Sequence, residues 1–174
     1  MPIMPDTKNW TWVLDRPCPE CGFDATTITA RDVAGLVRAN AAAWPAVLQR
    51  ADVAQRPDDS TWSPLEYAAH VRDVYRIFRV RLGLMLDEED PVYPNWDQDE
   101  TALAERYNAQ EPAAVAREIV AAGSALAEAF DAIPDAAWSR PGRRSDGATF
   151  TIASFAVYLA HDPTHHLWDV RAAE

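Results

Sequence analysis

The sequence predicts an all-α protein, a four-helix bundle preceded by an irregular N-terminal arm. Two observations lead to this fold class: four stretches repeat apolar residues at helical spacing, and no stretch shows the alternation or the hairpin-turn residues typical of strands. A chain of 174 residues with 48% hydrophobic residues fits one domain that buries its own core. We therefore expect an arm at residues 1–28 and the bundle at residues 29–174.

The arm and the first helix are distinguished by a change in pattern. Residues 1–28 are rich in Pro, Trp, Asp and Thr and have no sustained period, which indicates an arm laid over the domain. In "ITARDVAGLVRANAAAWPAVL", Thr29 is the expected N-cap, and apolar residues recur at helical spacing from Val33 to Leu48. The first helix is predicted there.

The second helix carries the fullest set of start signals. Ser63 is the expected N-cap, Pro64 takes the first helical position, and Glu66 closes a capping box. The helix is expected to end near Leu86, because the following "DEEDPVYPNWDQDE" is acidic, contains two prolines and breaks the period. A short helix through Tyr107 is expected after this loop, and loops of such length often border a site.

The third and fourth helices lie in the C-terminal half of the chain. One begins near Pro112 and repeats apolar residues as far as Phe130. Residues 134–148 read as a loop from their Pro, Gly, Ser and Asp content, and the last helix is predicted to begin near Thr149. Four-helix bundles often build metal sites in their interior from residues on facing helices.

The charge of the chain excludes some partners. With 27 acidic and 16 basic residues, the formal net charge of -11 repels phosphate backbones and anionic lipid, so nucleic acid is not expected as a partner. The sequence contains neither a run of 18 apolar residues nor the pattern of an export signal. We expect a cytoplasmic protein without a membrane partner, whose two cysteines are reduced thiols.

The histidines give the strongest functional signal. The segment "YLAHDPTHHLWDV" holds three of the four histidines, and His161 and His165, four positions apart, share one helix face. His166 is turned about 140° from His161 and is therefore assigned to another face. His70 falls on the apolar, inward side of the second helix. If the two helices are neighbours, three imidazoles converge on a divalent ion and leave a position for water or substrate. Asp162 and Asp73 are candidate acids to support these ligands.

Two alternatives compete with this metal site. A buried histidine is more often a hydrogen-bonded core residue than a ligand, and a spacing of four arises by chance. Pro163, which lies between His161 and His165, removes a helical hydrogen bond to the Leu159 carbonyl and kinks the helix. The kink either splays the two histidines or turns His161 into the bundle. The inward position of His70 on a different helix favours the metal site.

The segments around these histidines resemble a known family. "WSPLEYAAHVRDV", followed some ninety positions later by "LAHDPTHHLWDV", with "AERYN" and "DAAWSR" between them, is similar to the DinB-like (DinB/YfiT) superfamily of four-helix metal-binding proteins. The resemblance covers roughly residues 30–171. It implies a divalent metal on His70, His161 and His165, and a homodimer. The family's second segment usually reads H-x-x-x-H-H with an acid after the first histidine, which Asp162 matches, whereas Pro163 and Thr164 depart from the commoner residues.

The resemblance also implies an activity. Some members are S-transferases or isomerases that use low-molecular-weight thiols such as bacillithiol, mycothiol or glutathione. We therefore expect a divalent ion, zinc first and nickel, iron, manganese or cobalt as alternatives, that activates a thiol toward a small electrophilic substrate. A non-enzymatic metal-binding stress-response module and a metal-dependent hydrolase are the alternatives. No catalytic or thiol-binding residue is assigned from the sequence.

Cys18 and Cys21 form a second motif, "RPCPECGFD". Their spacing fits half of a zinc site or a redox dithiol, but the favoured interpretation is a turn that packs the arm. A closed zinc centre would need two chains or ligands borrowed from elsewhere, because no second C-x-x-C or spare histidine pair is recognised. Three further residues are noted as candidates near the site: Trp62 and Trp168 as pocket walls, and Arg81 as the group that holds a substrate carboxylate.

Overall fold

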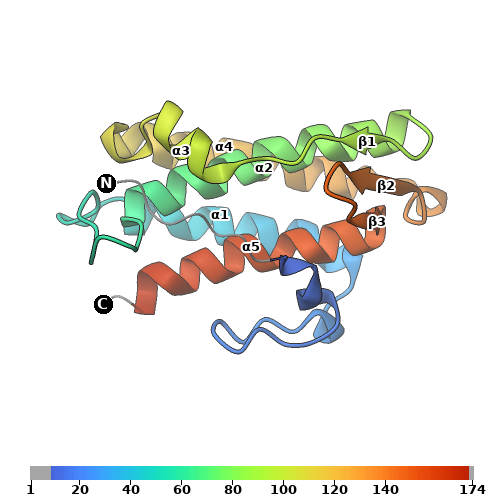
Figure 1. Cartoon of the computed structure of the whole chain (residues 1–174), viewed down its shortest axis with the longest axis horizontal. Helices are drawn as coiled ribbons and strands as arrows, with labels where there is room; N and C mark the ends of the chain where they lie inside the picture. Colours follow the sequence, from blue (N-terminus) through green and yellow to red (C-terminus); the bar gives the residue numbers. More distant parts are fainter. Residues whose placement is uncertain (1–8, 173–174) are drawn as a thin grey trace.

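The computed structural model describes residues 9–172, and its long helices form the four-helix bundle that the sequence predicts. The bundle consists of α1 (Val33–Val47), α2 (Pro64–Asp87), α4 (Pro112–Asp131) and α5 (Ile152–Ala172), with a short α3 (Gln98–Ala104) beside it (Figure 1). Before α1 the described part of the arm, residues 9–28, contains the 3-10 turns η1 (Trp10–Leu14) and η2 (Ala25–Thr27). Residues 1–8 of the predicted arm lie outside the described residues.

The helix starts follow the local signals in the sequence. At α2, Glu66 accepts a hydrogen bond from the Ser63 backbone N–H while the Ser63 side chain accepts one from the Glu66 N–H, and Pro64 occupies the first position. At α1, the Asp32 carboxylate accepts from both the backbone N–H and the hydroxyl of Thr29. A 3-10 turn, η3 (Ala30–Asp32), intervenes before the α-helix begins.

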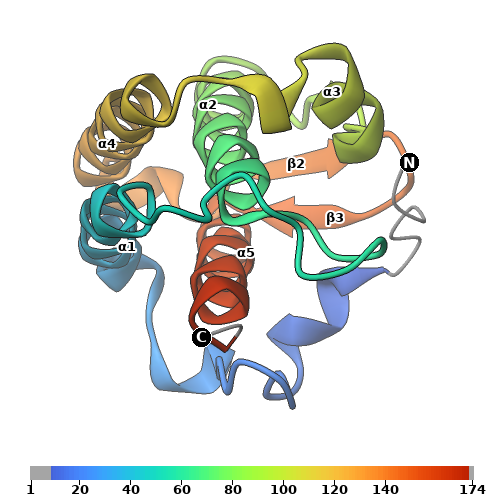
Figure 2. The same ribbon diagram turned by 90° about the vertical axis from the view of Figure 1, so that its left-hand side faces the viewer.

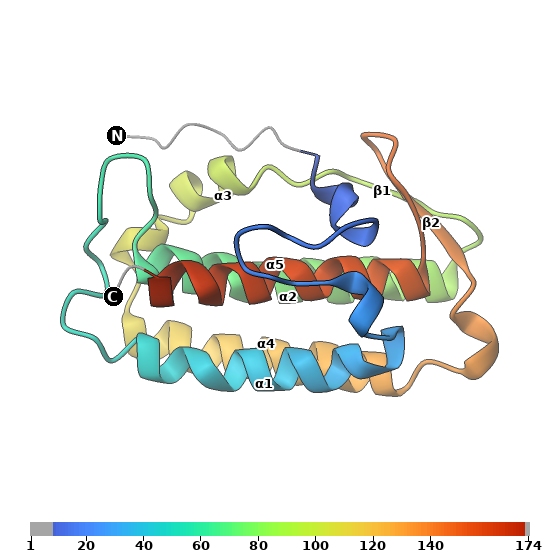
Figure 3. The same ribbon diagram turned by 90° about the horizontal axis from the view of Figure 1, so that it is seen from below.

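The helices form two layers, with α1 and α4 in one and α2 and α5 in the other (Figures 2 and 3). Both α1 and α2 pack against α4 and against α5. The arm, α3 and the strands lie on the side of the α2–α5 layer that faces away from α1 and α4 (Figure 3). Residues of α2 and α5 that point away from the bundle core therefore face a space that these irregular segments enclose.

A small sheet is present that the sequence analysis did not predict. β1 (Val92–Tyr93) pairs in parallel with β2 (Pro141–Arg144), which forms a hairpin with β3 (Thr149–Thr151). These strands are two to four residues long, too short for a readable alternation, and β2 has the composition of a loop. Because β3 takes up Thr149–Thr151, α5 begins at Ile152 instead of Thr149.

Pro163 does not interrupt α5, which runs as one helix from Ile152 to Ala172. The Asn40 side-chain amide of α1 donates to the Pro163 carbonyl at 2.6 Å, and the Thr164 hydroxyl donates to the Ala160 carbonyl at 2.6 Å. These bonds tie the proline-containing turn to α1 and to the preceding turn. Among the described residues, no helix combines the length and the apolar character needed to cross a bilayer.

Candidate metal centres

The histidines of α5 point in two directions because neighbouring positions on a helix are turned by about 100°. Within residues 9–172, two groups of side chains bring metal-ligating atoms within 4.8 Å of one another. The first group joins the arm to α5 and consists of Cys18, Cys21, His161 and His165. The second group joins α2 to α5 and consists of His70, Asp162 and His166. We call them the arm group and the α2 group.

The structure divides the three predicted ligands between these groups. The rings of His161 and His165 lie together, with centroids 5.1 Å apart, as their spacing predicts. His70 instead meets His166, with centroids 4.9 Å apart and nearly perpendicular planes. The rotation that separates His166 from His161 is the reason: it turns His166 and Asp162 toward α2, while His161 and His165 face the arm.

Buried polar atoms converge in the α2 group. His70 is fully buried, and within the described chain neither of its ring nitrogens nor Asp162 Oδ1 has a hydrogen-bond partner. His70 Nε2 lies 3.4 Å from Asp162 Oδ1, and His166 Nε2 lies 3.8 Å from the same oxygen. Because an unsatisfied buried polar group costs about 1–3 kcal/mol, the close approach of His70 Nε2 to Asp162 Oδ1, with neither atom hydrogen-bonded within residues 9–172, fits a site built for a cation.

Neighbouring side chains fix the orientation of these ligands. His166 Nδ1 is 2.9 Å from Asp169 Oδ2, which sets the tautomer that carries the ligating lone pair on Nε2. Trp96 stacks on His70 at 5.3 Å with an interplanar angle of 3°, and Trp62 lies against the same ring. The walls of the α2 group are thus aromatic, as expected for Trp62 from the sequence.

The charge state of Asp162 suits a cation. Burial raises the pKa of this carboxyl group, but the imidazoles of His70 and His166, when protonated, outweigh burial and hold the pKa below its usual range. Asp162 is therefore ionised at neutral pH and contributes a negative charge to the group. Asp73, the other candidate acid, lies elsewhere, because it pairs with Arg72 and Arg76 and accepts from the Tyr107 hydroxyl.

The arm group offers two thiols and two imidazoles. Burial, reinforced by the neighbouring His165, lowers the pKa of His161 to about 4, so that its ring is neutral at pH 7. Burial also lowers the pKa of His165, whose Nδ1 lies 3.7 Å from Cys18 Sγ. His161 Nε2 is buried without a hydrogen-bond partner among the described residues. Neutral imidazoles are the form that binds metal.

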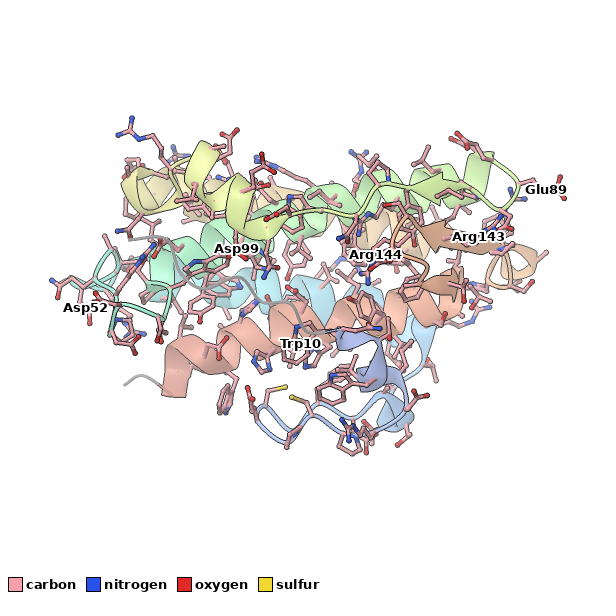
Figure 4. The ribbon with its side chains drawn as sticks, in the orientation of Figure 1. Trp10, Asp52, Glu89, Asp99, Arg143 and Arg144 are labelled. Carbon is pink, nitrogen blue, oxygen red and sulfur yellow. The ribbon has the colours of Figure 1, made fainter. Side chains whose placement is uncertain are left out.

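A cavity of about 870 Å³ adjoins both groups. The lining of this cavity includes Trp10 from the arm, Asp99 from α3 and Arg144 from β2 (Figure 4). Asp162 and His166 also line it, whereas His70 lies behind them. The α2 group is therefore covered on the helix side and accessible from the cavity.

The sequence analysis missed Arg144, a basic residue that lines the cavity. Arg144 pairs with Asp146 at 2.8 Å and donates to the Tyr158 hydroxyl at 3.2 Å, and all three residues line the cavity. Arg81, the predicted carboxylate-binding residue, is buried, donates to the Pro94 carbonyl and lies over the Tyr93 ring. The loop composition around Arg144 gave no signal, because its role depends on a hairpin that the sequence did not reveal.

The fold and these groups define a helical bundle whose second and last helices carry side chains that could hold a metal ion. The chain belongs to the DinB superfamily, whose family model matches residues 14–170. This confirms the resemblance on which the sequence analysis relied.

A solved structure shares the fold. The chain is similar to YfiT from Bacillus subtilis, described as a probable metal-dependent hydrolase with an unusual four-helix bundle topology, with a TM-score of 0.68. The match covers 82% of this chain and 84% of that chain at 16% sequence identity, so it supports the fold alone. None of the curated proteins compared with this sequence matches it.

Proposed function

We propose that the chain is a divalent-metal-dependent enzyme that transfers a low-molecular-weight thiol to a small electrophile, with the ion held by His70, Asp162 and His166. The observation that carries this proposal is the α2 group itself: buried atoms of His70 and Asp162, without a hydrogen-bond partner among the described residues, lie together with His166 beside a large cavity. The sequence predicted His70, His161 and His165 as ligands. We favour Asp162 and His166 as the partners of His70 because their donor atoms lie within 4.8 Å of one another.

The donor set fits the ion that the family implies. Two imidazoles and a carboxylate accept zinc, iron, manganese, nickel or cobalt, and three protein ligands leave at least one position for another molecule. Such an ion supplies Lewis acidity, which polarises a substrate oxygen and lowers the pKa of a thiol or a water. A purely structural ion would need neither the open position nor the adjoining cavity.

The chain's own residues perform the remaining tasks. Asp169 orients His166, and the rings of Trp62 and Trp96 hold His70 and exclude water behind it. Arg144, fixed by Asp146 and Tyr158, presents a guanidinium that can hold a carboxylate or nitro group of the substrate.

The size of the cavity favours transfer between two bound molecules. A volume of about 870 Å³ is near the upper end of ordinary ligand pockets, which span about 300–1,000 Å³. A thiol and an electrophile fit together in such a space. Small thiols of this kind are abundant in the cytoplasm, which agrees with the expected location. A homodimer stays a prediction that light scattering of the purified protein tests.

Hydrolysis is the second candidate function, favoured by the similarity to YfiT, which is described as a probable metal-dependent hydrolase. The same open position would then serve water. The two activities differ in their requirement for a thiol, and this difference decides between them.

Purified full-length protein, loaded with zinc or manganese, tests the proposal. With a chlorodinitrobenzene and a thiol, the thiol sulfur bonds to the ring carbon, chloride leaves, and the thiol proton passes to solvent. We expect turnover that depends on both metal and thiol and that falls at least about 100-fold in His70→Gln and Asp162→Asn. Asp87→Asn, an exposed carboxylate at the end of α2, is the matched control and should keep full activity.

The outcomes separate the alternatives. Cleavage of a nitrophenyl ester without thiol, combined with no thiol-dependent turnover, would replace transfer by hydrolysis. If Asp162→Asn keeps the ion and the activity while His161→Gln loses both, the triad of His70, His161 and His165 is the correct ligand set. Metal binding without either activity would indicate the non-enzymatic module.

A further inference from the structure

We propose that Cys18, Cys21, His161 and His165 form a second, closed zinc site that fastens the N-terminal arm to α5. This site is separate from the α2 group and does not depend on the proposed activity. It explains a cysteine pair that the function leaves unused and two histidines that face away from His70.

The local backbone around the cysteines has the form of a metal-binding turn. The Cys18 N–H donates to the Phe23 carbonyl at 2.8 Å, and the Gly22 N–H donates to the Cys18 carbonyl at 3.0 Å. Gly22 has a φ of +74°, a conformation that glycine adopts without strain. The turn closes tightly and brings the sulfurs of Cys18 and Cys21 to one point.

The distances between the ligating atoms agree with tetrahedral zinc. All four atoms lie within 4.8 Å of one another, and Cys18 Sγ is 3.7 Å from His165 Nδ1. With Zn–S bonds of about 2.3 Å and Zn–N bonds of about 2.0–2.1 Å, neighbouring sulfur and nitrogen ligands are about 3.6 Å apart. Two thiols and two imidazoles form a complete four-ligand set, which leaves no position for substrate.

Surrounding groups prepare the ligands. His165 turns Nδ1 toward the sulfur, while its Nε2 lies 3.3 Å from Glu20 Oε2, so a carboxylate can hold the opposite side of the ring. Trp10 and Phe23 pack on His161 with ring centroids 5.4 Å away, which shields the group from water. Two thiolates also balance the charge of a divalent ion at this half-buried place.

The arm needs such a fastening. Between Trp10 and Ile28 it contains 3-10 turns but no α-helix or strand, yet Val13 and Cys18 are almost fully buried. The arm also supplies Trp10 and Glu20 to the cavity wall. The zinc site would therefore fix one wall of the cavity without taking part in the chemistry there. The ligands that the cysteine pair lacks come from α5 of the same chain, so one chain completes the site.

Cadmium titration of the metal-free, reduced full-length protein tests the proposal, because cadmium–thiolate bonds absorb in the ultraviolet and histidine–carboxylate sites do not. We expect about two ions per chain in the wild-type protein, one of them with thiolate absorption. Cys21→Ser should lose most of the absorption and bind about one ion. His70→Gln is the matched variant: it should also bind about one ion but keep the full absorption.

Several results would overturn the proposal. A wild-type titration without thiolate absorption excludes the site even if Cys21→Ser fails to fold. A protein whose mass is lower by two hydrogens, and which binds cadmium through sulfur only after it is reduced in vitro, contains a disulfide there. Loss of the absorption in His70→Gln, with its retention in His161→Gln, would place the thiolates on the other ion. A failed activity test leaves this site unaffected, because its signal does not require turnover.

Discussion

At the scale of single residues, Asn40 is the polar centre of the bundle core. Its side chain accepts hydrogen bonds from Trp44 Nε1 at 2.9 Å and from the Tyr75 hydroxyl at 2.8 Å, and it donates to the Pro163 carbonyl. It therefore connects α1 to α2 and α5 at the turn that carries the α5 ligands. A change here should affect both stability and the shape of the site.

We expect Asn40→Ala to lower the free energy of unfolding by about 2–4 kcal/mol, because two buried donors lose their acceptor. Urea unfolding followed by circular dichroism measures the change. Asn95→Ala, at an exposed position, is the control and should stay within about 0.5 kcal/mol of the wild type. Equal effects of the two substitutions would show that the Asn40 network contributes nothing.

Asp73 gives a pH-dependent prediction. Burial raises its pKa, but hydrogen bonds from Arg72 and Tyr107 outweigh burial and lower the pKa below the usual value. A carboxylate with a lowered pKa stabilises the fold above the unfolded pKa and loses this effect as the pH falls through the folded value. Asp73→Asn should therefore cost about 1–3 kcal/mol at pH 7, and the difference from wild type should shrink below about pH 4.

Unfolding curves of both proteins across this pH range check the prediction. Asp135→Asn removes a carboxylate that pairs with Arg31 at an exposed surface site, and it should have little effect at any pH. A cost for Asp73→Asn that stays constant down to pH 2 would contradict the assigned cause.

At the scale of elements, α1 and α4 approach each other at a glycine. A Cβ on Gly123 would lie 2.6 Å from Ala41 Cβ and 3.3 Å from a ring carbon of Tyr75. Real Cβ atoms do not come so close to a backbone-anchored methyl group, so the helices would have to separate. The close contact holds together the side of the bundle opposite the cavity.

Gly123→Ala should destabilise the protein by about 1–3 kcal/mol in thermal or urea unfolding, although alanine is the better helix former. Gly35→Ala is the matched control on α1, where a Cβ meets nothing within 4 Å. That change should stabilise the protein by up to about 1 kcal/mol through helix propensity alone. If both substitutions stabilise, the close approach of α1 and α4 is wrong.

The helices could be predicted from the sequence because their signals are local. The capping box at Ser63 and the prolines at Pro64 and Pro112 depend on residues within one turn of each other. The sheet could not be predicted, since the pairing of Val92 with Arg143 joins segments of the chain that are far apart. Arg144 was missed for the same reason.

At the scale of the whole molecule, the ligand groups depend on which segments lie beside α5. The spacing of His161 and His165 predicts that they share a face, and this is confirmed. The spacing does not say whether that face meets α2 or the arm. The position of the arm decides, and it results from contacts between residues more than a hundred positions apart, such as Cys18 with His165.

The last prediction concerns the attachment of the arm to the bundle. If zinc on the arm group holds the arm, a strong chelator should release it while the four helices stay folded, because the arm contributes little structure of its own. Phe23, now 9% exposed, should then be cut by chymotrypsin at least about tenfold faster, as measured by mass spectrometry of the fragments. Cys21→Ser should be cut quickly with or without chelator, and His70→Gln should behave like the wild type. Cleavage at the same slow rate in all three proteins, with and without chelator, would mean that apolar contacts of Val13 and Phe23 hold the arm without a metal ion.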